Sequence, residues 1–243
     1  VACGRDPGAG AEPSALPAVK GEITVFAAAS LTESFTQFGR EFEAANPQAK
    51  VVFNFAGSAA IAAQINQGAP ADVFAAAAPA NVQTVVDAGN AAGPPTIFAR
   101  NQLVIAVPKG NARGIAGLAD LAKPGVKVAL CAEQVPCGAA ARQALAAARV
   151  RLTPVTLEQD VKATLSKVKL GEVDAALVYR TDALAAASDV DGIELAESAA
   201  TANEYPIIAL RGGPNPDGAQ AFIAYVLSER AKAVLGEAGF QTP

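Results

Sequence analysis

Ile23-Thr-Val-Phe-Ala-Ala-Ala-Ser30 and Val51-Val-Phe-Asn-Phe-Ala-Gly-Ser58 share one local pattern. Each is an apolar run typical of a β-strand, followed by small residues, a serine and a helical periodicity. The first backbone N–H groups of a helix have no internal partner, and the helix dipole places partial positive charge there. The two serines therefore predict one anion held between two helix N-termini.

The alternation of strand and helix continues beyond these two stretches. Three strand–helix units in succession imply a parallel sheet with right-handed crossovers. The predicted elements of this part are Ile23–Ala28, Leu31–Ala45, Val51–Phe55, Ala59–Gln67, Asp72–Ala76 and Ala80–Ala88.

The pattern changes after Gly93-Pro94-Pro95, where a strongly apolar strand is predicted over Leu103–Val107. The order of the later elements fits two α/β units, with the chain crossing between them near Arg100 and again near Tyr205. These later elements are Gly117–Ala122, Val126–Leu130, Gly138–Ala148, Asp160–Lys169, Ala175–Tyr179, Asp182–Ala187, Tyr205–Leu210 and Gly218–Ala238, the last as one or two helices.

Composition argues against several classes of function. The chain has 243 residues, of which 51% are hydrophobic, and it contains no histidine. A Ser-His-Asp triad, the commonest general base and most zinc sites are therefore excluded. The net charge is −4 with no basic block, which argues against nucleic acid as a partner. No run approaches the ~18 apolar residues of a membrane span.

Residues 1–20 are expected to form a lipid anchor and a flexible linker. Val1-Ala2-Cys3-Gly4 opens a segment rich in Gly, Ala and Pro. A small residue followed by cysteine and a tether resembles the end of a bacterial lipoprotein signal peptide. Cys3 is therefore predicted to carry a lipid that holds an extracytoplasmic protein at the cell membrane. An incidental cysteine in a tail is the alternative.

Cys131 and Cys137 enclose Ala-Glu-Gln-Val-Pro. In an exported protein such a pair predicts a disulfide, and two buried thiols are the alternative. A metal site is not expected here, because no third soft ligand exists beyond Cys3.

Both serines have a structural explanation beside the functional one. Ser30 and Glu33 have the spacing of a capping box, in which each side chain bonds the backbone N–H of the other residue. A serine hydroxyl can cap a helix and still donate to a ligand. Ser58 has Ile61 at the box position, so it is interpreted as an exposed donor beside Gly57, with a plain N-cap as the alternative.

Three residues of the second half are weaker candidates by themselves. Tyr179 ends a predicted strand, where open α/β sheets bind ligands, but on the residue alone an amphipathic side chain at a sheet rim is the favoured explanation. Cys137 and Val161 stand at predicted helix starts, where only the backbone N–H could serve an anion. An ordinary helix start that faces water is the alternative for both.

Six short stretches occur in a recognisable order. They are Ile23-Thr-Val-Phe-Ala-Ala-Ala-Ser30-Leu-Thr, Phe55-Ala-Gly-Ser58, Gly68-Ala-Pro-Ala-Asp72-Val-Phe, Val135-Pro-Cys-Gly138, Glu158-Gln-Asp-Val161 and Val178-Tyr179. Together they resemble the periplasmic molybdate-binding proteins of ABC importers. The likeness extends over nearly everything from Lys20 to Gln241.

The resemblance implies a type II periplasmic-binding-protein fold: two α/β lobes with mixed, mainly parallel sheets, joined by crossing strands. Lobe 1 is expected over residues 21–99 and 206–243, and lobe 2 over residues 100–205. The cleft between them would hold the oxyanion. The protein would act as a monomer that passes its ligand to an ABC permease in the membrane.

The resemblance also implies the ligand donors. Hydroxyl donors are expected at Ser30, Ser58 and Tyr179, and backbone N–H donors at the two serines, Cys137 and Val161. No catalytic residue and no cofactor is expected, and molybdenum would be bound only within its oxyanion.

Three positions depart from the pattern of that family. Cys137 stands where a small alanine is typical, which leaves the backbone donor intact. Gly57 stands where a further serine can occur. Arg180 stands where a glycine can follow the tyrosine, and it is expected to add a charge at the cleft mouth.

A pocket of neutral donors would discriminate among anions. Every oxygen of a buried ion needs a donor. Phosphate at pH 7 usually carries a proton that needs an acceptor, whereas molybdate, tungstate and sulfate carry none. The predicted function is capture of molybdate or tungstate. Alternatives are another oxyanion such as sulfate, an α/β enzyme acting on phosphorylated small molecules, and a lipid-tethered structural domain.

Overall fold

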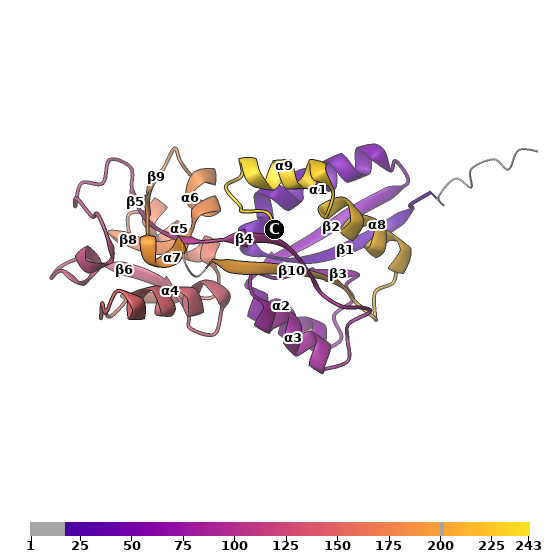
Figure 1. Ribbon diagram of the computed structural model, residues 1–243, viewed down its shortest axis with the longest axis horizontal. Coiled ribbons are helices and arrows are strands. Elements are labelled where there is room, and N and C mark those ends of the chain that lie inside the picture. Colours follow the sequence, from indigo (N-terminus) through magenta and orange to yellow (C-terminus); the bar gives the residue numbers. More distant parts are fainter. Residues whose placement is uncertain (1–17, 200–201) are drawn as a thin grey trace, which may run out of the picture.

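A computed structural model of the chain describes residues 18–199 and 202–243, so the predicted lipidation site Cys3 lies outside the described residues. The chain forms two lobes side by side, each built on one five-stranded sheet (Figure 1). No helix in the described ranges is long and apolar enough to cross a membrane.

The first lobe is the part built on the sheet with strand order β2-β1-β3-β10-β4. β1 pairs in parallel with β2 and β3, while β10 is antiparallel to β3 and β4. α1, α8 and α9 cover one face of this sheet, and α2 and α3 the other (Figure 1). Its elements are β1 (Gly21–Ala28), a 3₁₀ turn (Ala29–Leu31), α1 (Thr32–Ala45), β2 (Ala49–Ala56), α2 (Ser58–Asn66), β3 (Val73–Ala75), α3 (Pro79–Asp87), β4 (Thr96–Asn101), β10 (Asn203–Ala209), α8 (Pro216–Val226) and α9 (Glu229–Glu237).

The second lobe is the part built on the sheet with strand order β7-β6-β8-β5-β9. β6 is parallel to β7 and β8, and β5 is antiparallel to β8 and β9. Its elements are β5 (Leu103–Pro108), a 3₁₀ turn (Leu118–Ala122), β6 (Val128–Cys131), α4 (Pro136–Ala147), β7 (Thr156–Glu158), α5 (Val161–Lys169), β8 (Ala175–Tyr179), α6 (Arg180–Ala185), β9 (Val190–Glu194) and α7 (Ala196–Ala199).

The predicted fold class of two mixed α/β lobes joined by crossing strands is confirmed. The sheets are mixed as expected but not mainly parallel, since each has two parallel and two antiparallel strand pairings. β4 runs directly into β5, and the return passes through β10 (Figure 1). The proposed domain limits at residues 99/100 and 205/206 stay a prediction.

Four elements were not predicted: β4, β7, β9 and α7. β7 has only three residues, and β9 contains Asp191 and Gly192, which are poor strand formers. Gly218–Ala238 is two helices, since α8 ends at Val226 and Ser228 caps α9 by accepting from the Ala231 N–H at 3.3 Å.

The apolar stripe of α1 forms the centre of the first lobe. Phe35 and Phe38 are fully buried and Phe42 nearly so. Phe222 of α8 meets Phe35 and Phe42 edge to face, with ring centroids 6.0 and 5.5 Å apart. This packing fixes α1, and with it the turn that carries Ser30, against the sheet.

An ion-pair cluster connects α1 to the second lobe. Lys162 of α5 donates to both carboxylate oxygens of Glu33 at 2.7 and 2.8 Å. Its Nζ also lies 3.0 Å from Oδ1 of the buried Asp182. Burial disfavours the charge on Lys162, but the carboxylates of Asp182 and Glu33 outweigh it and raise its pKa.

Asp182 is the member of this cluster that lacks well-aligned hydrogen-bond donors among the described residues. Neither of its oxygens accepts a hydrogen bond of good geometry within the described part of the chain. Burial raises its pKa to about 6, against the opposing effect of Lys162. A carboxyl whose pKa is raised on folding binds its proton more tightly in the folded state, so stability falls as pH rises between the two pKa values.

Asp182→Asn should remove this dependence on pH. The unfolded carboxyl has a pKa of ~3.9, so from pH 4.5 to pH 7.5 the wild type should lose about 2 kcal/mol of unfolding free energy relative to the variant. Urea unfolding at both pH values measures the difference. Asp87→Asn, at an exposed carboxylate, is the matched control. Parallel pH profiles for wild type and Asp182→Asn would contradict the assignment.

Candidate oxyanion-binding site

All five predicted ligand-binding residues line one small cavity between the lobes. Its volume of about 20 Å³ is room for an object of roughly the size of a water molecule or a small ion. The lining residues are Ala28, Ala29, Ser30, Gly57, Ser58, Ala77, Val135, Pro136, Cys137, Asp160, Val161 and Tyr179.

Helix starts from both lobes meet at this cavity. Ser58 is the first residue of α2, Val161 the first of α5, and Cys137 the second of α4. Ser30 lies in the 3₁₀ turn that leads into α1. By position, the first-turn N–H groups of these helices have no partner within their own helix, so they can donate into the cavity.

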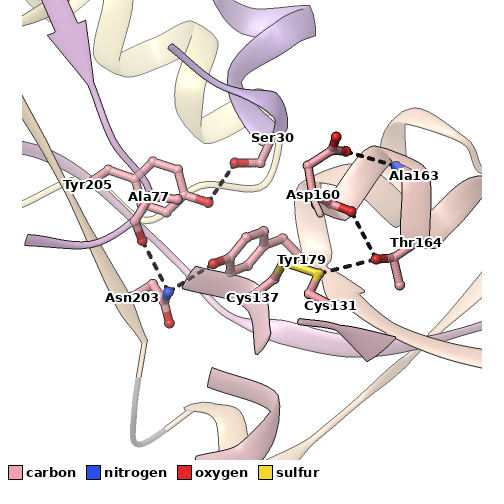
Figure 2. The surroundings of a disulfide bond; sticks show 10 residues. All are labelled: Ser30, Ala77, Cys131, Cys137, Asp160, Ala163, Thr164, Tyr179, Asn203 and Tyr205. Atoms are coloured by element: carbon pink, nitrogen blue, oxygen red, sulfur yellow. Dashed lines mark hydrogen bonds between the residues drawn. A yellow bond between two sulfur atoms is a disulfide. The ribbon is translucent and has the colours of Figure 1, made fainter. Parts of the chain in front are cut away.

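Each hydroxyl of the cavity forms a hydrogen bond with a neighbouring polar group. Ser58 Oγ accepts from the Ala77 N–H at 3.0 Å. Ser30 Oγ lies 2.8 Å from the Tyr205 hydroxyl, and the Tyr179 hydroxyl accepts from Asn203 Nδ2 at 2.9 Å (Figure 2). The three hydroxyls are buried, so their orientation is fixed by protein rather than by bulk water.

The expected capping box at Ser30 is not formed. No side chain caps the 3₁₀ turn or α1, and the Ser30 hydroxyl is directed to Tyr205 instead. Glu33 pairs with Lys162 across the lobes. The prediction of a capping box is therefore wrong, because the Ser30 hydroxyl bonds Tyr205, far away in the sequence, instead of the backbone of Glu33. Ser58 is likewise no N-cap, since that position is held by Gly57.

The cavity lining holds no lysine or arginine. Its one charged residue is Asp160, whose Oδ1 accepts from the Ala163 N–H at 2.9 Å as the N-cap of α5. Burial, and then the neighbouring Tyr205, raise the pKa of Tyr179 well above its usual value. The phenol therefore keeps its proton and can donate. No cluster of three or more metal-ligating side chains exists within residues 18–199 and 202–243.

Cys131 and Cys137 form the predicted disulfide, with Cα atoms 5.7 Å apart. The bond joins the end of β6 to the first turn of α4, and Thr164 Oγ1 of α5 lies 3.2 Å from Cys131 Sγ (Figure 2). The backbone N–H of Cys137 is thus held on a covalently closed loop.

The lobes touch closely at Gly57. A Cβ added to Gly57 would overlap the backbone carbonyl oxygen of Gln159, in the turn before α5. Any other residue at this position would require the main chain of one lobe to shift.

Arg180 does not provide the expected charge at the cavity. Its guanidinium donates to both oxygens of Glu194 at 2.8 and 2.6 Å, and it is absent from the cavity lining. The ion pair with β9 compensates its charge locally.

A much larger cavity of about 1000 Å³ contains none of the donors. It lies against α4 and β7 and is lined largely by apolar side chains and by Arg142, Arg149 and Arg151. Of the five predicted residues it includes none. Convergence of donors, and not cavity size, therefore singles out the candidate site.

Sequence reasoning missed four residues around the cavity: Ala77, Asn101, Asn203 and Tyr205. Asn101 and Asn203 are paired in register on the crossing strands β4 and β10. Tyr205 is fully buried beneath Ser30. For Asn101, Asn203 and Tyr205 the one available signal was their position near the predicted crossing points, because the side-chain bonds of Asn203 and Tyr205, and those that Asn101 donates, are long-range.

Comparisons with known proteins agree with this geometry. Residues 23–241 match the family model of bacterial extracellular solute-binding proteins. The chain is 42% identical to the molybdate-binding protein ModA of Mycobacterium tuberculosis, covering 100% of this chain and 93% of that protein. It is 31% identical to ModA of Escherichia coli, covering 91% and 89%.

Two solved structures show the same fold. The periplasmic molybdate-binding protein of Azotobacter vinelandii superposes with a TM-score of 0.77 at 22% identity, covering 91% of this chain and 99% of that one. The sulfate-binding protein SubI of Mycobacterium tuberculosis also gives 0.77, at 19% identity, covering 91% and 86%. Taken with the family match and the two-lobed cavity, these relatives show that the chain belongs to the bacterial extracellular solute-binding proteins and is not an enzyme.

Proposed function

We propose that this protein captures molybdate, and also tungstate, for an ABC importer. The observation that carries the proposal is the convergence of three hydroxyls and four helix starts on one small cavity whose lining holds no cation. Relatives named as molybdate-binding proteins cover the whole chain and support the same ligand. The protein would act as a monomer and deliver its ligand to the permease.

Neutral donors suit a fully deprotonated tetrahedral dianion. The ligand is desolvated into N–H and O–H dipoles supplied by both lobes, so each oxygen can be satisfied only when the lobes are closed. Long-range attraction cannot assist, because the chain has a net charge of −4. Sulfate is the second candidate, since a neighbour of the same fold is a sulfate-binding protein.

Titration with molybdate, tungstate, sulfate and phosphate tests the proposal. At a hundredfold excess over its dissociation constant, molybdate should raise the unfolding free energy by about 2.7 kcal/mol, and tungstate should do the same. Phosphate should have a much smaller effect, because its proton needs an acceptor and Asp160, the one carboxylate among the described lining residues, is already the N-cap of α5. Calorimetry and thermal unfolding measure both. Stabilisation by sulfate alone would favour the second candidate, and no response to any of the four would refute oxyanion capture.

Ser58→Ala should weaken molybdate binding by about 1–3 kcal/mol, because a hydroxyl that bonds a charged ligand is lost. The variant also leaves the Ala77 N–H without its acceptor, so unfolding of the ligand-free protein is measured beside the affinity. Ser166→Ala is the matched control, since this exposed hydroxyl bonds only its own helix. Unchanged affinity in Ser58→Ala would assign Ser58 to folding alone.

We propose further that Cys3 carries a lipid that anchors the protein outside the cell membrane. A relative in Bacillus subtilis, 30% identical over 90% of this chain, is named a putative ABC transporter substrate-binding lipoprotein. Expression in a bacterium behind a lipoprotein signal peptide should place the protein in the membrane fraction, with a mass increase at Cys3. Cys3→Ser should release it. A wild-type protein that is unlipidated and free of the membrane would contradict the anchor.

A further inference from the structure

Asn203 stands where the crossing strand β10 begins and makes contacts in both lobes. Its Nδ2 donates to the backbone carbonyl of Ala77 in the first lobe at 3.1 Å and to the hydroxyl of Tyr179 in the second at 2.9 Å (Figure 2). A carbonyl oxygen can only accept, so the amide nitrogen must face Ala77, and the orientation of the side chain is determined.

This orientation decides what Tyr179 can do. Both protons of the Asn203 amide are used, and an N–H group accepts nothing, so the Tyr179 oxygen must accept from Asn203. The Tyr179 proton is therefore left for another acceptor. Tyr205 is the competing acceptor, with its ring centroid 5.9 Å from that of Tyr179. An anion in the cavity should accept the Tyr179 proton in preference to Tyr205, because charge-assisted hydrogen bonds are roughly twice as strong as neutral ones.

The same logic applies to Ser58. Ala77, whose carbonyl binds Asn203, gives its N–H to Ser58, so the Ser58 proton is left for the cavity. The N–H of Gln102 donates to Asn101 Oδ1 at 3.0 Å, which turns Asn101 Nδ2 toward Thr181 and, at 3.4 Å, toward the Tyr205 oxygen.

The Ser30 and Tyr205 hydroxyls lie 2.8 Å apart, and either of them can be the donor of this bond. Asn101 and Asn203 face each other in the register of β4 and β10. The two crossing strands thus carry the amides that set the hydrogen-bond direction around the cavity.

We propose that Asn203 is a positioning residue that fixes Tyr179 as a hydrogen-bond donor and so restricts the site to fully deprotonated tetrahedral oxyanions. Asn203 is outside the cavity lining and acts through Tyr179. A protonated oxyanion such as hydrogen phosphate needs one acceptor, and this arrangement removes the phenol oxygen as that acceptor. The one carboxylate of the described lining, Asp160, is held at Oδ1 by the Ala163 N–H as the N-cap of α5. The inference rests on the proposed function and adds to it the residue that enforces the selectivity.

A double-mutant cycle with sodium molybdate tests the role of Asn203. Asn203→Leu, Tyr179→Phe and the double variant are compared with wild type by calorimetry. Asn203→Leu should weaken binding about tenfold, the loss expected for one misdirected hydrogen bond to a charged ligand. In the Tyr179→Phe background the same change should have no effect, because no hydroxyl remains to be oriented. Asn54→Ala, whose amide bonds only the exposed Gln64, is the control and should bind as wild type.

The outcomes separate the possibilities. An equal loss with and without the Tyr179 hydroxyl would show that Asn203 only supports the fold, and no loss in Asn203→Leu would also overturn the inference. Asn203→Ala replaces the leucine variant if ligand-free melting shows that the latter does not fold. Wild-type protein that binds no oxyanion would refute the proposed function itself.

Asn203→Asp tests the selectivity separately. A carboxylate can only accept, so Tyr179 would donate to it and present a lone pair to the cavity. Phosphate should then compete with molybdate about tenfold better than it does in wild type. Phosphate competition as weak in Asn203→Asp as in wild type would overturn the selectivity part of the proposal.

Discussion

Two parallel strands cannot be joined by a hairpin, so a helix must return the chain between them. In this molecule that constraint acts twice, on β1, β2 and β3 in one lobe and on β6, β7 and β8 in the other. Each returning helix begins at the carboxyl end of a strand. In both lobes these carboxyl ends point toward the cavity between the lobes. The cavity is therefore surrounded by helix starts, and its chemistry follows from the connectivity of the chain.

The candidate site contains no cationic side chain among its described lining residues. The ion pairs near it, Glu33–Lys162 and Arg180–Glu194, are satisfied among themselves. The interaction of a dipole with an anion depends on the direction of the dipole, whereas that of a point charge does not. Binding at such a site would therefore depend on the orientation of each hydroxyl and amide group. The hydrogen bonds behind the lining thus matter as much as the residues that face the cavity.

The sequence predicted the parts of this molecule that depend on local pattern. The Phe stripe of α1, the small residues before Ser58 and the spacing of Cys131 and Cys137 are all visible in short windows, and the structure has each of them. β4 and β9 were missed because pairing with distant strands, and not propensity, makes them strands. The Ser30–Tyr205 bond joins residues 175 positions apart, so a capping box was the natural but wrong expectation.

The contact between Gly57 and the carbonyl of Gln159 has a consequence for ligand size. Both sides of the contact are main-chain atoms, so their van der Waals radii set the minimum separation of the lobes. A side chain at residue 57 would force the two main chains apart, so this glycine limits how small an object both lobes can contact at once. The missing side chain at this one position thus sets the closest approach of the two lobes.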